Sequence, residues 1–235
     1  MTKVEMVLDT HRSSWAMSAS HGTELDRSSR GKAYYDLVTK RDDHVCRACS
    51  WRSTRYQEIH PLDGNHRSKD ADNWVTLCPL CHQVFHLPQA SGTGGGKLIW
   101  LPEISQAHLN LLSIPLFIAL RNPRHRFYGL ATTFKGALSN RASYFQSRFY
   151  QDDPMLMAQV IVSMSAEERS TSAPNTLRGN LKKNVRLWAQ PERFEAAIDH
   201  WEQESFKDWK DTDWEKALPK GFDLTKLMTQ EPTYG

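Results

Sequence analysis

The chain has 235 residues, of which 39% are hydrophobic and 24% are charged. This composition is typical of a globular protein and excludes wholesale disorder. Thirty Lys and Arg against 27 Asp and Glu give a net charge of +3, which excludes a protein that coats nucleic acid along its whole length. Residues 1–9 lack the apolar run of a secretion signal, and the most apolar stretch, residues 109–120, is too short to cross a bilayer. We therefore expect a cytoplasmic protein that does not insert into the membrane.

Composition and motifs divide the chain into four regions. The first, residues 1–40, is predicted to pack on the core, and Tyr34, Leu37 and Val38 indicate a helix over residues 33–39. The others are a metal-binding module, a helical region rich in basic and aromatic residues, and a Trp-rich helical segment, at residues 41–90, 91–173 and 174–235.

The four cysteines form the strongest motif. Cys46 and Cys49 make one Cys-x-x-Cys pair, and Cys78 and Cys81 make a second after 28 intervening residues. Two such pairs supply the four thiolates of a structural zinc site, and each two-residue gap lets one tight turn present both sulfurs to the same ion. Disulfides are disfavoured without a secretion signal, and a redox motif does not need a second copy. Because four thiolates leave no open coordination position, the spacing predicts one structural Zn²⁺.

Beyond the cysteines, glycine and proline mark further boundaries. Residues 91–96, Ser-Gly-Thr-Gly-Gly-Gly, are expected to form a flexible linker and lack the ending of a phosphate-binding loop. The apolar stretch over residues 104–120 predicts a buried helix that is kinked or ended near Pro115. Another boundary is expected at Pro174 and Gly179.

The stretch between Glu103 and Asp152 contains no acidic residue, while six basic residues alternate with aromatic ones. It has three interpretations: binding phosphates and stacking bases, docking on an acidic partner protein, or a solvated basic face with its aromatic side chains turned into the core. The basic residues are Arg121, Arg124, Arg126, Lys135, Arg141 and Arg148.

Near the end of the chain, Pro191 is expected to start a helix. Phe194, Ile198, Trp201 and Trp209 would lie on one face of it and pack on the core or on a partner. Trp188 and Trp214 complete the four tryptophans of this Trp-rich segment.

The residues between and after the cysteine pairs resemble the HNH, or ββα-metal, nuclease family over residues 45–87. The resemblance lies in the cysteine frame, in His60 and Asn73, and in a helix starting at Cys81-His82. In that family a β-hairpin carries the first histidine, and the helix carries two metal-binding histidines four residues apart. His82 and His86 have this spacing, which places both on one helix face. Pro88 is expected to stop the helix.

In the HNH family, a histidine beside the first ligand activates water, and here that position is Pro61. Proline has no titratable nitrogen, and loss of a positioned base costs about 10²–10⁴ in rate. His66 is a conceivable substitute base, and the histidines also fit a simpler role in orienting the cysteine sulfurs. Residues 41–90 carry six basic and six acidic side chains, whereas a module that grips DNA needs uncompensated positive charge. We therefore interpret His60, Asn73, His82 and His86 as a vestigial HNH site.

A more specific resemblance is to the IcmJ/DotN family, over about residues 45–120. It is carried by Cys-Pro-Leu-Cys-His-Gln-Val-Phe-His-Leu at 78–87 and by Leu-Ile-Trp-Leu-Pro-Glu-Ile-Ser-Gln-Ala-His-Leu-Asn at 98–110. Members are components of the Dot/Icm type IVB secretion system and of related conjugation machines. The resemblance implies one zinc on the four cysteines and a cytoplasmic position peripheral to the inner membrane. It also implies binding to the C-terminal tail of a DotL-type coupling ATPase and to the associated chaperone adaptors.

Taken together, the sequence predicts an α+β protein in which an HNH-like ββα zinc module is embedded in a mostly helical chain. Its expected function is that of a non-catalytic adaptor that helps to recruit secreted substrates. The alternatives are an HNH-type metal-dependent DNA endonuclease, resting on the histidines, and a nucleic-acid-binding protein, resting on residues 121–150 alone.

Overall fold

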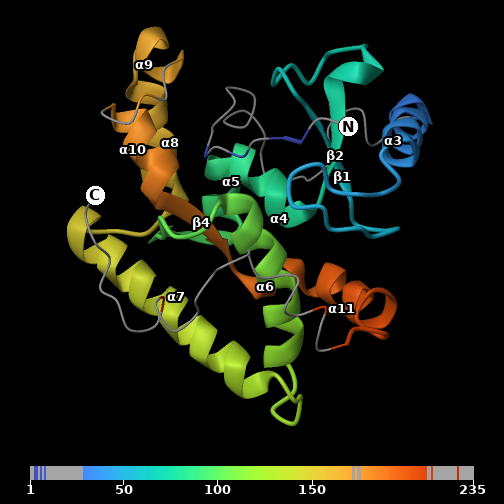
Figure 1. Ribbon diagram of the computed structural model, residues 1–235. Helices are drawn as coiled ribbons and strands as arrows, with labels where there is room; N and C mark the ends of the chain where they lie inside the picture. Colours follow the sequence, from blue (N-terminus) through green and yellow to red (C-terminus); the bar gives the residue numbers. More distant parts are fainter. Residues whose placement is uncertain are drawn as a thin grey trace.

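A computed structural model describes residues 3, 4, 6, 8, 29–170, 173, 176–210, 213 and 227 (Figure 1). These residues form a mixed helical and β structure with two small antiparallel sheets. The longer helices are α3 (Ser29–Arg41), α6 (Gln106–Leu120), α7 (Tyr128–Phe149), α8 (Pro154–Ser163), α10 (Leu177–Asn184) and α11 (Glu195–Glu204). The shorter helical segments are η1 (Ala71–Asn73), α4 (Pro79–His82), η2 (Gln83–Phe85), α5 (Leu87–Gly92), α9 (Ala166–Ser170) and η3 (Pro191–Phe194). The strands are β1 (Glu58–Pro61), β2 (Trp74–Leu77), β3 (Gly96–Trp100) and β4 (Val185–Ala189).

The first sheet is the hairpin β1–β2, in which Glu58 pairs with Leu77 and Pro61 with Trp74. Helix α3 packs on one face through Val38, which is buried with Ile59 and Trp74. This helix confirms the one predicted over residues 33–39 and is longer at both ends. Figure 1 shows the hairpin between α3 and α4. Because side chains alternate along a strand, Glu58 and His60 lie on the opposite face from Ile59.

The second sheet pairs β3 with β4, which are distant in sequence, with Gly96 opposite Ala189 and Trp100 opposite Val185. Residues 185–189 therefore form a strand, although the sequence predicted a helical segment there. Val185 and Leu187 are buried with Leu98 in one hydrophobic cluster, and pairing with β3 satisfies the backbone groups of a stretch that is buried at every position.

The glycine-rich residues 91–96 do not form the flexible linker that was predicted. Helix α5 includes Gly92, Gly94 makes the turn with a φ of 64°, and the amide of Gly95 donates to the carbonyl of Ala90 at 2.7 Å. A Cβ on Gly96 would lie 2.7 Å from Cδ1 of Leu187, so only glycine lets the two strands approach at this point. The glycines here serve a tight turn and a close contact, and the domain boundary predicted at residues 90/91 falls inside α5.

Helix α6 is the central helix and lies between α7 and α11 (Figure 1). Ser105 caps its start by accepting from the amide of His108. The sequence predicted a kink or an end near Pro115, but the helix continues through Pro115 to Leu120. Residues 112–119 are all buried, so packing on both sides compensates for the backbone hydrogen bond that proline removes.

The C-terminal predictions have mixed outcomes. Phe194, Ile198 and Trp201 are buried together as predicted, in η3 and α11. The helix ends at Glu204, so Trp209 packs on the same cluster from beyond it. Gly179 lies inside α10, while Pro174 and Trp214 are outside the described residues. Within the described part of the chain, no helix has the length and apolarity needed to span a membrane.

The close approach at Gly96 makes a testable prediction. Replacing Gly96 with Ala should destabilise the fold by about 1–3 kcal/mol, because the new methyl group would overlap buried Leu187. Replacing Gly136 with Ala is the matched control, since its Cβ would meet nothing within 4 Å on an exposed face of α7, and it should stabilise by about 0.5–1 kcal/mol. Urea unfolding of both variants measures the difference, and a Gly96→Ala protein as stable as wild type would contradict the packing described here.

Candidate metal centre

The four cysteines come together in the interior, as their spacing predicted. Their sulfur atoms all lie within 4.8 Å of one another, and the Sγ atoms of Cys49 and Cys78 are 3.7 Å apart. All four side chains are buried, and none forms a disulfide. This is the set of donors and the compactness that a single tetrahedral ion requires.

Two tight turns present these sulfurs. In the loop after α3, the amide of Cys46 donates to the carbonyl of Trp51, and the amide of Ser50 donates back to the carbonyl of Cys46, at 2.8 and 2.9 Å. Ser50 has a φ of 68°, which closes this turn. At the start of α4, the amide of Cys81 donates to the carbonyl of Cys78 at 2.9 Å, with Pro79 in the first turn. Each Cys-x-x-Cys motif therefore lies in a tight turn that is held by its own backbone hydrogen bonds.

The electrostatics of the cluster favour a bound cation. Burial and contacts with the other cysteines raise the pKa of Cys78 and of Cys81 well above the ordinary thiol value. Burial also opposes ionisation of Cys46, but hydrogen bonds from the other three side chains outweigh it and lower the pKa of Cys46. Since like charges repel at these distances, a full set of four thiolates requires a compensating cation.

Sequence reasoning missed the polar group that supports this cluster. Asn110, on α6, is fully buried, and its Nδ2 donates to the carbonyl of Leu80 at 3.0 Å and to Sγ of Cys81 at 3.4 Å. Gln106, one turn earlier, donates to Oδ1 of Asn110 at 2.9 Å. In the sequence Asn110 only interrupts an apolar run, but a buried amide inside such a run signals a specific partner.

A second cluster contains the histidines. His60 from β1, with His82 and His86, has ring nitrogens within 4.8 Å of one another, and Nε2 of His82 and of His86 are 3.1 Å apart. Phe85 stacks on His60 with ring centroids 4.5 Å apart. His60 and His86 are buried, so these imidazoles meet in the interior, between the hairpin and the helical segment.

Two more side chains join this group. Nδ1 of His82 contacts the carboxylate of Glu58, which shares a strand face with His60. The ring centroid of His66 lies 5.8 Å from that of His60 and 5.5 Å from that of His86. Glu58 was not among the site residues predicted from the sequence. Its position two residues before His60 places both side chains on one face of the strand and could have indicated it.

Asn73 and Pro61 lie at the edge of this group and shape the loop between the strands. Nδ2 of Asn73 donates to Oδ1 of Asp63 at 2.7 Å, and its carbonyl accepts from the amide of Leu62. The carbonyl of Pro61 accepts from the amide of Gly64. Asn73 thus holds the hairpin loop.

The helical segment that carries His82 and His86 is not one continuous helix. Helix α4 ends at His82, η2 covers residues 83–85, and His86 leaves helical geometry with a φ of −131° and a ψ of 53°. Pro88 does not stop a helix as predicted, because it lies in the first turn of α5, where proline is favoured. The tighter turn of η2 still brings the two imidazoles together.

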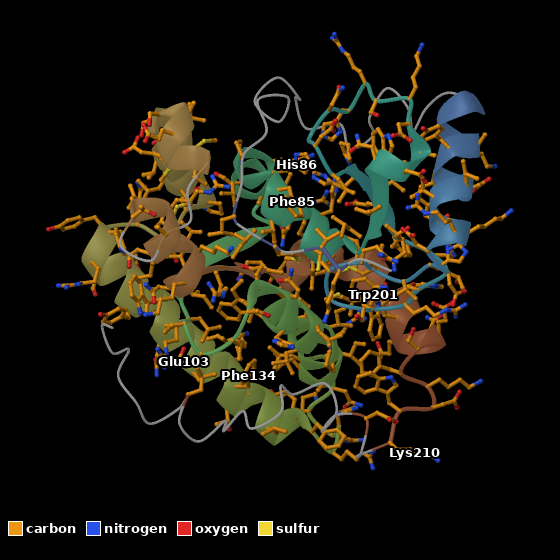
Figure 2. The ribbon with its side chains drawn as sticks, turned by 45° about the horizontal axis from the view of Figure 1, so that its top comes forward. Phe85, His86, Glu103, Phe134, Trp201 and Lys210 are labelled. Carbon is orange, nitrogen blue, oxygen red and sulfur yellow. The ribbon has the colours of Figure 1, made fainter. Side chains whose placement is uncertain are left out.

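Figure 2 shows Phe85 and His86 together and apart from Trp201. Trp201 belongs to the hydrophobic cluster that contains the cysteines, and its ring is 5.9 Å from that of Trp51. Because Cys81 and His82 are adjacent, α4 separates the cysteine side of the module from the histidine side.

Two acidic side chains of the module, Asp42 and Asp43, bind other residues of the same module. Asp42 is buried, and its carboxylate accepts from Nε of Arg41 at 3.1 Å and from the amide of Thr76 at 2.8 Å. Burial opposes ionisation of Asp42, but these hydrogen bonds prevail and lower its pKa. Asp43 is paired with Arg52 on the surface. The negative charge noted in the sequence is therefore partly neutralised within the module.

Some of the basic residues in the stretch 121–150 form ion pairs with acidic residues of the same chain. Arg121 pairs with Asp199 and Glu202 of α11, and buried Arg141 pairs with Glu103. The interpretation as a solvated basic face with inward aromatic side chains holds only in part, because Arg141 is buried while Phe149 and Tyr150 are exposed. The buried aromatic residues are Phe134 and Phe145.

Comparison with known proteins agrees with this architecture. No known family profile matches the chain. The sequence is 29% identical over 210 residues to the type 4 apparatus protein DotN of Legionella pneumophila, and the match covers 85% of this chain and 90% of that protein. It extends well beyond the motifs at residues 45–120, so the similarity involves the helices as well as the cysteine cluster. This similarity confirms the resemblance to the IcmJ/DotN family and extends it to most of the chain.

Proposed function

We propose that this protein is a non-catalytic, zinc-containing adaptor of a type IVB secretion coupling complex. The observation that carries the proposal is the similarity to a type 4 apparatus protein along 85% of the chain. In this role it binds the C-terminal tail of a DotL-type coupling ATPase, and with the associated chaperone adaptors it helps to recruit secreted substrates. It is held at the cytoplasmic face of the inner membrane through that complex.

The four-cysteine cluster supports zinc as the resident ion. Four sulfur donors within 4.8 Å suit tetrahedral Zn²⁺, and their burial excludes the water that a catalytic zinc would need. Asn110 donates to one sulfur, the usual role of a group that orients a ligand and spreads its charge. When bound, the ion supplies a cross-link between the loop after α3 and the start of α4.

The same cluster connects the surfaces that an adaptor would use. The cysteines are buried with Ile114 of α6 and Ile198 of α11, so the ion fixes how these helices sit on the hairpin. Pro61, at the position where the HNH resemblance expects a base, is engaged in a turn instead. The proposed function therefore assigns no reaction to the chain.

The zinc assignment is tested by replacing Cys46 with Ser. The purified protein should contain one zinc in the cysteine site, and the variant should lose it and unfold the module, because metal binding and folding are coupled in small sites. Metal analysis and near-ultraviolet circular dichroism measure both effects. Arg47→Ala, inside the same Cys-x-x-Cys loop, keeps all four thiols and should keep the zinc.

If the Cys46→Ser protein cannot be purified, chelation of the wild-type protein gives the same information. Removal of zinc should abolish the near-ultraviolet signal, and added Zn²⁺ should restore it. A Cys46→Ser protein with a full complement of zinc and normal melting would show that the ligand assignment is wrong.

The adaptor role is tested by co-purification of the full chain with the C-terminal tail of the coupling ATPase from the same organism. We expect a stable complex, and we expect it to be lost when zinc is removed. Absence of binding to the wild-type, zinc-loaded protein would contradict the proposed function.

A second candidate function, metal-dependent phosphodiester cleavage, is favoured by the convergence of His60, His82 and His86. Their ring nitrogens suit a divalent ion, and His66 lies near enough to be tested as the missing base. Glu58 contacts Nδ1 of His82 and leaves Nε2 facing His86, an arrangement that also suits a metal ligand. Against this candidate, the module as a whole is neutral.

Relaxation of supercoiled plasmid DNA separates the two candidates. With Mg²⁺, Mn²⁺ or Zn²⁺, the adaptor proposal expects no relaxation by wild-type protein. Cleavage that His82→Ala abolishes and His125→Ala preserves would establish the nuclease, since His125 lies in a loop outside the cluster.

A further inference from the structure

A cavity of about 470 Å³ opens beside the cysteine cluster. Four parts of the chain line it: residues near the N-terminus, the Cys46–Cys49 loop, the start of α6, and the junction of α10 with β4. None of these parts belongs to the histidine cluster. The cavity is thus a feature separate from the vestigial HNH site.

The charged side chains that line this cavity in the described part of the chain are all basic. Lys3, Lys182 and Arg186 line it together with His108, and no acidic residue of the described chain does. Burial, followed by the charge of Lys3, lowers the pKa of His108, as expected for an imidazole in a positive environment. Three basic side chains and one imidazole therefore line the same volume, an arrangement that suits an anionic ligand.

Arg186 is the most unusual member. It is only 7% exposed, and its guanidinium donates to backbone carbonyls, among them those of Ile104 and Lys182 at 2.7 and 2.8 Å. Its hydrogen-bond partners in the described chain are all carbonyl oxygens, and no carboxylate pairs with it. Burial lowers the pKa of Arg186 to about 10. The charge of Glu103 acts in the opposite direction but is outweighed by burial. A buried cation with no directly bonded carboxylate is costly, and a ligand that places a carboxylate beside it would be held more firmly.

The backbone adds to this field. Helix α6 has 15 residues, and its first turn, Ser105 to His108, lines the cavity. Ser105 already caps the amide of His108, while the amides of Gln106 and Ala107 belong to the first helical turn, which has no intrahelical acceptor. The positive end of the helix dipole therefore reinforces the side-chain charges.

The rest of the lining is mixed, with Ser50, Ser105 and Gln106 beside apolar residues. Val4, Met6, Ala48 and Leu111 contribute side chains, and the cavity is much larger than one inorganic anion. A ligand that fills it must carry both a carboxylate or similar group and an aliphatic portion.

We propose that this cavity is the docking site for an acidic, aliphatic-containing segment of a partner protein. A Glu or Asp side chain of the segment faces Lys3, Lys182 and Arg186, and a neighbouring aliphatic side chain packs on Met6 and Leu111. This inference deepens the proposed function, on which it rests, by naming the chemistry of the bound tail. Since Cys49 also lines the cavity, the zinc-bound loop forms one of its walls.

Charge reversal of Lys182 tests the site without disturbing buried Arg186. Binding of the coupling ATPase tail is measured by fluorescence anisotropy for wild type, Lys182→Glu and Lys183→Glu, each with its zinc content and melting checked. Lys183 is the matched control, because it is exposed on the same helix and does not line the cavity. We expect Lys182→Glu to weaken binding by roughly tenfold or more and Lys183→Glu by much less.

A second probe separates failure of this inference from failure of the proposed function. It is a labelled peptide that alternates Glu and Leu, with a Gln–Leu peptide as its uncharged counterpart and inorganic phosphate as competitor. Tail binding that is equal in wild type and Lys182→Glu would overturn the docking site and leave the adaptor role intact.

The remaining outcomes are also decisive. If the tail does not bind wild type but the Glu–Leu peptide does, in a Lys182-dependent way, the proposed function fails and the acidic docking site stands. If the Gln–Leu peptide binds as well as the Glu–Leu peptide, or phosphate binds while neither peptide does, the acidic-segment proposal is wrong.

Discussion

The structure depends on bringing four cysteine thiols into one dry volume. Burial raises the pKa of Cys78 and Cys81, so the protons on these sulfurs are retained unless a cation compensates the negative charge. A divalent ion at this point would compensate the negative charge of the thiolates. It would also cross-link the two Cys-x-x-Cys turns, which are separated by 28 residues in the sequence. Because Ile114 and Trp201 pack around the same sulfurs, the cross-link also determines how α6 and α11 meet the hairpin.

Local chemistry made parts of this arrangement predictable. The two-residue gap of each Cys-x-x-Cys pair and the four-residue spacing of His82 and His86 are properties of a single turn, and the structure brings both sets together. The helix at α3 and the buried face of Phe194, Ile198 and Trp201 follow from apolar periodicity in the same way. The assignment of an ion to these sites remains a prediction.

The features that sequence reasoning missed are those decided by distant partners. Residues 185–189 become a strand because residues 96–100 pair with them, and nothing in either stretch identifies the other. In the sequence alone, Gly96 indicates flexibility. In the structure it lies against Leu187, and its lack of a side chain permits the two strands to pack closely. Pro115 remains inside a helix because tertiary contacts outweigh its local cost. Asn110 donates to Cys81, which lies 29 residues away in the sequence and becomes its neighbour only in the fold.

Helix α4 divides the module into two chemically independent sides. Cys78 and Cys81 face the core shared with α6, while His82 faces Glu58 and His60 of the hairpin. A change on the histidine side, such as proline at position 61, can therefore leave the sulfur side unaltered. A scaffold built in this way can change the residues of its histidine side and keep its fold. The interactions that stabilise it lie on the cysteine side, on the opposite face of α4. The cavity lined by basic residues lies on the sulfur side, where Cys49 forms part of its wall, so the binding we propose would depend on the part of the module that a bound metal would hold rigid.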